Sequence, residues 1–182
     1  MRGEQWLHQR PWGRWDYFVK GAWWTWTMYE FFKALHIFGL ILMAGNVTVT
    51  AFWKVFADRT CKTQIIGFAQ WLVTVTDFTF TLTGGFLMVI GGYGAALVGG
   101  IPLFETPWLV VGQIMLLLSG GIWLLILVPI QIRQARYARD FAIIGDVPEV
   151  YKKDSRTWLV WGLISTVPLT LGMYSMVFKP YF

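Results

Sequence analysis

Four stretches of this chain are long and apolar enough to cross a lipid bilayer, and they constrain the fold more than any other feature. They cover about residues 28–53, 68–98, 108–131 and 157–178, and each reaches the ~20 residues that a transmembrane helix needs. A hydrophobic content of 56% and a mean hydropathy of +0.53 are typical of a polytopic membrane protein. The sequence therefore predicts an all-α membrane protein, a four-transmembrane-helix antiparallel bundle formed by residues 28–182.

Residues 1–27 form a Trp-rich N-terminal tail ahead of the first apolar stretch. Trp and Tyr concentrate where one part of the ring is wet and the other is in an apolar environment, so the tail is expected to be interfacial, on the membrane surface. Trp and Arg also dominate protein interfaces, which makes a docking arm for a neighbouring subunit the alternative. The candidate docking residues are Trp6, Trp12, Trp15, Trp23, Trp24 and Trp26.

The basic residues predict how the bundle is oriented in the membrane. The two loops that join helices 1 to 2 and 3 to 4 carry nine basic residues, against five in the tail, the 99–107 loop and the C-terminus. Cytoplasmic loops are enriched in Lys and Arg, so we expect a multi-pass protein of the bacterial inner membrane with both termini periplasmic. The net charge of +5 follows this pattern and indicates no nucleic acid partner. Cys61 is the only cysteine, which excludes an intrachain disulfide.

Polar residues inside the first two apolar stretches indicate that these helices pack on each other. His36 and Asn46 share one face of helix 1 with small residues, while Asp77 lies on a polar and glycine-rich face of helix 2. Antiparallel pairing is expected to place Asp77 at the depth of Asn46, and His36 near Gly84–Gly85. Asp77 is then hydrogen-bonded to Asn46 and threonines, or protonated, or part of an ion path.

Helices 3 and 4 add fewer chemically distinctive residues. Gln113 is predicted to be a buried polar residue near the depth of His36, and the methionines of helix 4, Met173 among them, share that depth. These methionines fit core packing, but a His/Met pair is also a ligand set for haem. Residues 140–156 are expected to form the longest loop. The sequence shows no metal-ligand spacing, nucleophile triad or nucleotide loop, so no catalytic residue and no metal site is predicted.

Several short motifs are distributed along the four apolar stretches and their connections. They are Lys33-Ala34-Leu35-His36, Gly45-Asn46, Trp53-Lys54 to Ala57-Asp58-Arg59, Phe104 to Trp108, Gly121 to Pro129, and Trp161-Gly162. With these motifs the chain resembles a family of bacterial predicted integral membrane proteins of unknown function. The resemblance covers about residues 28–180 and implies a four-helix architecture. At a greater distance, helix 1 is similar to that of HemJ-type membrane protoporphyrinogen oxidases and copper-resistance D-type proteins, which share a histidine near the outer end.

Three functions are consistent with these features. The first is a non-catalytic accessory or assembly subunit of a larger, energy-transducing membrane complex, which would use the aromatic tail and need no enzyme chemistry. Its partners would be the lipid bilayer and other membrane subunits. The second is a haem- or porphyrin-handling membrane protein with His36 as ligand. The third is a proton or metal path along helices 1 and 2, through His36, Asn46 and Asp77.

Overall fold

The computed structural model describes residues 22–180, and every regular element in that part of the chain is a helix. Four helices within it are long and apolar enough to span a membrane. The fold is therefore an all-α four-helix membrane bundle, as the sequence predicted. These spans are Trp24–Arg59, Thr63–Val98, Pro107–Asp140 and Glu149–Phe178.

Two of the four spans contain a π-helical segment, in which the backbone holds one more residue per turn. The first span is α2 (Ala22–Arg59). The second consists of α3 (Thr63–Thr76), the π-helix η2 (Asp77–Leu82) and α4 (Thr83–Val98). The third consists of α5 (Pro107–Ile122), the π-helix η3 (Trp123–Leu127) and α6 (Val128–Ile144). The fourth is α7 (Glu149–Phe178).

The helices extend further than the apolar windows alone indicated. Residues 22–27, assigned to the tail from sequence, already belong to α2. The expected long loop over residues 140–156 is wrong, because α6 continues to Ile144 and α7 begins at Glu149. Gly145, with a φ of 88°, lies just after the end of α6, and Pro148 precedes α7 in an extended conformation. Polar helix turns beyond the apolar core are invisible to a hydropathy window.

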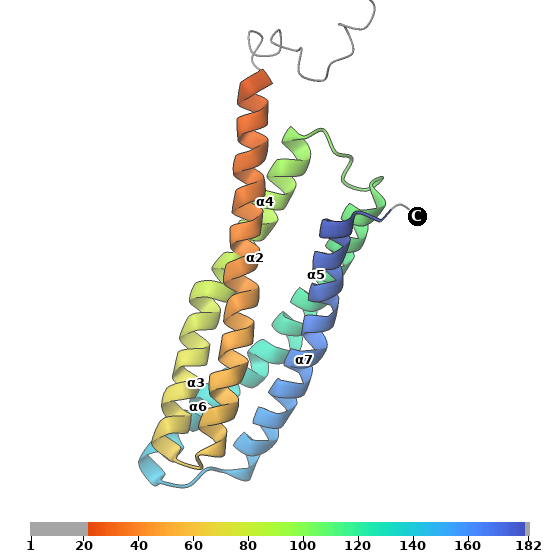
Figure 1. Cartoon of the computed structure of the whole chain (residues 1–182). Helices are drawn as coiled ribbons and strands as arrows, with labels where there is room; N and C mark the ends of the chain where they lie inside the picture. The colour runs from red at the N-terminus through yellow and green to blue at the C-terminus, as the bar shows by residue number, and fades with distance from the viewer. Residues whose placement is uncertain (1–21, 181–182) are drawn as a thin grey trace, which may run out of the picture.

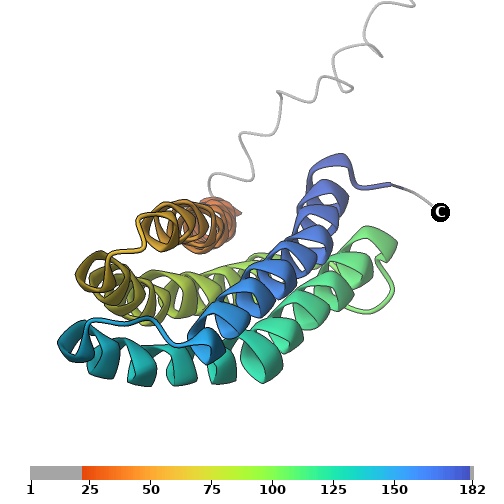
Figure 2. The ribbon, with the colours of Figure 1, turned by 90° about the horizontal axis from the view of Figure 1, so that it is seen from below.

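The bundle consists of two helical hairpins that are close at one end and apart at the other (Figures 1 and 2). Within the hairpins, α2 packs on α4 and α5 packs on α7, whereas the hairpins meet mainly through α3 and α6. We call the end with residues 60–62 and 145–148 the turn end, and the opposite end, with the 99–106 loop and Lys179, the terminal end. Both clusters of buried apolar side chains lie toward the turn end. They are Ile66, Ala138 and Tyr151, and Val73, Leu127, Ile130 and Trp158.

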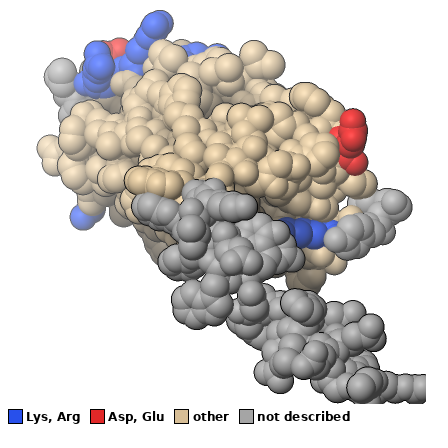
Figure 3. Space-filling view, turned by 90° about the horizontal axis from the view of Figure 1, so that it is seen from above, with Lys and Arg blue, Asp and Glu red and all other residues tan. Residues whose placement is uncertain are grey.

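Glycines bring α2 and α4 into backbone contact. A Cβ atom on Gly39 would collide with the backbone of Met88 and the carbonyl of Gly84, and one on Gly84 would lie 2.7 Å from the Gly39 carbonyl oxygen. Small residues allow this approach between membrane helices, where close packing drives association. Seen from above, most of the visible described surface is uncharged (Figure 3). Exposed apolar side chains such as Phe38, Ile41 and Val49 face away from the packed side of α2, as lipid-facing residues do.

Candidate functional site

His36 projects from α2 toward the space between the two hairpins at the terminal end. Its Nδ1 atom lies 2.7 Å from the backbone carbonyl oxygen of Met88 on α4. A carbonyl oxygen can only accept a hydrogen bond, so Nδ1 must carry the proton. In the neutral ring, Nε2 then has the free lone pair. This is the tautomer that a metal-binding histidine adopts when a backbone carbonyl orients it.

Two adjacent glycines on α4 determine where the His36 ring lies. A Cβ atom on Gly91 would collide with the backbone nitrogen of His36, and one on Gly92 would lie 2.8 Å from His36 Nδ1. Any larger residue at these positions would push the ring or the whole of α2 away. The local sequence therefore fixes the orientation of the imidazole as well as its depth.

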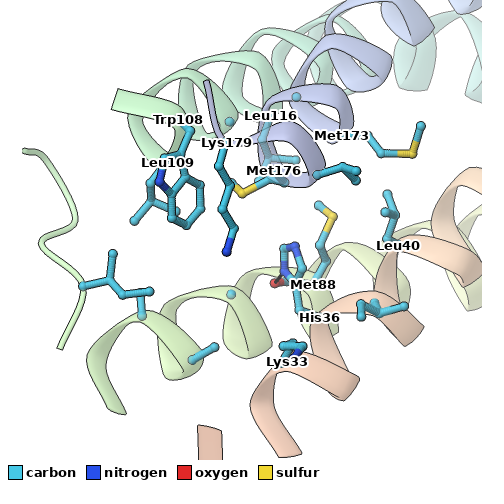
Figure 4. Close-up of a pocket in the computed structure, with 18 of the residues that line it drawn as sticks. Lys33, His36, Leu40, Met88, Trp108, Leu109, Leu116, Met173, Met176 and Lys179 are labelled. Atoms are coloured by element: carbon cyan, nitrogen blue, oxygen red, sulfur yellow. Dashed lines mark hydrogen bonds between the residues drawn. The ribbon is translucent and has the colours of Figure 1, made fainter. Parts of the chain in front are cut away.

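A mostly apolar cavity of about 320 Å³ lies beside the imidazole, between α2 and α4 on one side and α5 and α7 on the other. This volume is within the range for small-ligand pockets. Figure 4 shows His36 on one wall, with Met176 and Lys179 approaching from the other hairpin. Lys33 and Lys179 line the cavity with charged groups, and the Lys179 Nζ atom lies 5.1 Å from the centroid of the Trp108 ring. A second cavity of about 270 Å³ shares Leu116 and Leu169 with the first.

Two other residues from the sequence-predicted set lie nearby but differ from His36 in role. Gln113 is fully engaged: its Oε1 atom accepts a hydrogen bond from the Tyr93 hydroxyl (2.9 Å), and its Nε2 atom donates to the Leu103 carbonyl (2.8 Å). It therefore ties the 99–106 loop to α5. Met173 lines the cavity, but 46% of its surface is exposed. Met176 reaches further in, because its methyl carbon occupies the space beside Gly112.

The predicted polar contact between helices 1 and 2 is present in the middle of the bundle. Asn46 donates from Nδ2 to Asp77 Oδ1 (2.8 Å) and to Thr81 Oγ1 (2.9 Å), and Thr81 donates to the same carboxyl oxygen (3.1 Å). The expectation that His36 lies near Gly84–Gly85 is wrong. Gly84 faces Gly39, and His36 faces Met88 and Gly91, one to two turns further along. His36 comes ten residues before Asn46 on α2. In an antiparallel pair, the residues at the depth of His36 therefore come about ten residues after Asp77 or Thr81, in the region of Met88 and Gly91.

The most deeply buried charged side chain in the described part of the chain was not predicted from the sequence. Lys54 is one of the nine basic residues assigned above to the two loops, yet it is only 2% exposed. Its ammonium group donates to Gln70 Oε1 (2.8 Å) and to the Tyr151 hydroxyl (2.9 Å), and lies 3.7 Å from the Asp58 carboxylate. A signal was available: Lys54 comes four residues after Thr50 and eight after Asn46, on the inward face of helix 1.

The partner-docking tryptophans can be located only in part. Trp6, Trp12 and Trp15 lie outside the described residues, and the side chain of Trp23 is also outside the described part. Trp24 and Trp26 belong to the first turns of α2, and both are exposed.

Comparison with known proteins gives a family and no assigned activity. No curated protein and no solved structure matches this chain. One protein family, described as "Predicted integral membrane protein (DUF2269)", matches residues 30–180. The match includes the first membrane span from residue 30 onward and the other three in full, with His36, the Asn46–Asp77 contact and Lys54. The chain therefore belongs to the DUF2269 family of predicted integral membrane proteins.

Proposed function

We propose that this protein binds haem within the membrane, in the cavity between its two hairpins. The observation that carries the proposal is the hydrogen bond from His36 Nδ1 to the Met88 carbonyl. It leaves Nε2 as a metal ligand at the wall of an apolar cavity. If His36 served only to hold the two helices together, the hydrogen bond from Nδ1 would be sufficient, and Nε2 would have no structural reason to border a cavity.

The rest of the cavity fits the chemistry of haem. His36 Nε2 from the first hairpin and the sulfur of Met176 from the second would hold the iron, and histidine with methionine is a ligand set used by other haem proteins. The porphyrin would lie against the apolar lining contributed by both hairpins. Lys179 supplies positive charge for a propionate group, and Lys33, which is paired with Glu30 (2.9 Å), borders the same cavity. A site with oxygen ligands alone would favour other metals, whereas imidazole and thioether suit iron and copper.

A direct test is the visible spectrum of the purified protein, before and after addition of hemin. We expect a Soret band that His36→Gln abolishes, because glutamine cannot replace the imidazole as a ligand. The stability cost of this change should stay at ~0.6–2 kcal/mol, the worth of a hydrogen bond between membrane helices. Met176→Leu should alter the spectrum of the reduced protein, whereas Met173→Leu, the matched control, should leave it unchanged. Hemin binding that is equal in the wild type and His36→Gln would refute the proposal.

Two further binding experiments distinguish haem from related ligands. Metal-free protoporphyrin that binds as tightly as hemin, and without regard to His36, would indicate a porphyrin site in which iron plays no part. A colourless protein with copper bound in a His36-dependent way would indicate a copper site of imidazole and thioethers.

Two other proposals do not depend on haem binding: the accessory-subunit function and the orientation of the protein in the membrane. Docking through the tail, residues 1–27, concerns a segment of which residues 1–21 lie outside the described part, and a haem-binding subunit could dock in this way as well. The orientation with both termini periplasmic is testable at Cys61, which is exposed in the turn between α2 and α3. A membrane-impermeant thiol reagent should fail to label Cys61 in intact cells and should label it in inverted vesicles. The opposite pattern would reverse the orientation.

A further inference from the structure

We infer that the turn-end half of the bundle contains a hydrated path for protons, which leads from a pocket at the turn end to Asp77 in the middle of the membrane. This goes beyond haem binding and uses residues that the His36 cavity does not involve. It rests on four consecutive features of the described chain, taken here from the turn end inward.

The path begins at a polar pocket of about 350 Å³ at the turn end. Asp58, Asp146, Lys152 and Arg156 line it, together with the exposed Cys61. Asp58 lies between this pocket and the interior. Its Oδ2 atom accepts a hydrogen bond from the Ser155 hydroxyl and lies 3.7 Å from the Lys54 ammonium. A carboxylate in this position can take a proton from water in the pocket and pass it inward.

Lys54 forms the second step, one helical turn further in on α2. Its ammonium group contacts Gln70 on α3 and Tyr151 on α7, so it joins three of the helices. Among the other charged groups on α6 and α7, Arg133 and Asp154 form an ion pair (2.6 Å) whose guanidinium side is half exposed. The proton path therefore has one buried cation, with Asp58 on its aqueous side and Asp77 on its inner side.

The third feature is a group of buried amide atoms beyond Lys54 that lack protein partners. Gln134 is fully buried, and neither its Oε1 nor its Nε2 atom finds a hydrogen-bond partner among the described residues. The same holds for Gln70 Nε2 and Gln131 Oε1. These side chains lie on α3 and α6, which pack together. Buried amides are almost always hydrogen-bonded, and where protein groups do not supply the partner, internal water does.

The path ends at Asp77, beside the amide of Gln131. Asp77 accepts hydrogen bonds from Asn46 and Thr81, and Thr81 in turn lines the 270 Å³ cavity that adjoins the His36 cavity. The proton balance is simple. Lys54 gives a proton to internal water, Asp58 takes a proton from the pocket and passes it to Lys54, and the carboxylate of Asp77 becomes a carboxylic acid. One proton has then moved from the aqueous side to the edge of the ligand space.

The test measures how fast Asp77 responds to a pH jump, by time-resolved infrared spectroscopy of the full-length protein. The carboxylic C=O band of Asp77 is identified by its loss in Asp77→Asn. We expect Lys54→Met to slow the appearance of this band about 100-fold, the lower end of what a positioned proton-transfer group contributes. Gln134→Leu should slow it as well, because the leucine occupies the hydrated space without offering a hydrogen bond.

Gln134→Leu is the decisive variant if Lys54→Met does not fold, since it exchanges a buried amide for an apolar group of similar size. Gln113→Leu is the matched control, because its amide belongs to the other half of the bundle, and it should leave the rate unchanged. The inference is overturned if Gln134→Leu follows the pH jump as fast as the wild type, or if no pH-responsive band is assigned to Asp77. The measurement needs no haem, so a failure of the haem proposal does not affect it.

Discussion

The two halves of this bundle differ in what fills the space between the two hairpins. Toward the turn end, the hairpins are packed against each other, and a buried cation, several amides and a tyrosine hydroxyl fill the space between them. Toward the terminal end, the hairpins separate, each held together internally, with apolar cavities between them. The difference indicates a division of labour: the turn-end half holds the hairpins together, and the terminal half is free to hold a ligand.

The largest expected effect on stability comes from removing the cation of the turn-end half. Lys54→Ala removes the cation that Gln70, Tyr151 and Asp58 share, and breaking a buried pair typically costs about 3–5 kcal/mol. Thermal or denaturant unfolding in detergent would measure the loss. His36→Gln is the comparison, because it should cost little stability while abolishing haem binding. Equal stability losses in the two variants would contradict the division of labour.

An intermediate effect is expected where α2 meets α4 beside the cavity. Gly91→Ala forces a Cβ atom into the backbone of His36, and overpacking of this kind costs about 1–3 kcal/mol. The ring should also shift, so the variant should lose affinity for hemin in a spectroscopic titration. Gly121→Ala is the matched control, because nothing lies within 4 Å of an added Cβ there. If both variants bind hemin like the wild type, the close approach at Gly91 does not position His36.

The smallest effect is expected at the charged lining of the cavity. Lys179→Ala removes one positive group, and an exposed ion pair is worth about 0.2–1 kcal/mol, so hemin affinity should fall by no more than about five-fold. The loss should shrink as salt is raised, because salt screens exposed charges. Lys153→Ala, at the other end of the molecule, should change neither the affinity nor its salt dependence. A loss that is independent of salt would mean that Lys179 acts through packing on Trp108.

The sequence was sufficient for the fold class because a bilayer imposes so strong a requirement on helix length and polarity. It also predicted the Asn46–Asp77 contact, since two costly polar groups on neighbouring helices satisfy each other. Lys54 was misplaced for the opposite reason. A lysine near the end of an apolar stretch can extend to the interface, and burial is decided by what other helices bring to it. Its partners Gln70 and Tyr151 are 16 and 97 residues away in the chain.

The cavity could not be predicted from the sequence, for a related reason. The sequence predicted that His36 and the helix 4 methionines lie at the same depth, but a shared depth does not give their separation in the plane of the membrane. Whether two hairpins touch or separate depends on the sum of many side-chain contacts. The tautomer of His36 likewise depends on one carbonyl of Met88, a backbone group whose position no residue type reveals.

The π-helical segment η2 has a consequence for how this chain can change by insertion or deletion. Asp77–Leu82 accommodates its residues in a wider turn, and losing one residue there would allow an ordinary α-helix to form. Because the wide turn already takes up one extra residue, everything beyond residue 82 would then keep its orientation relative to α3. A deletion within the regular α-helix of α3 would instead rotate the rest of the span by about 100°, and Gly84, Met88 and Gly91 would leave the face of α2 together with the carbonyl that orients His36. This one turn is therefore where the span can lose a residue without changing the alignment of the polar half with the ligand-binding half.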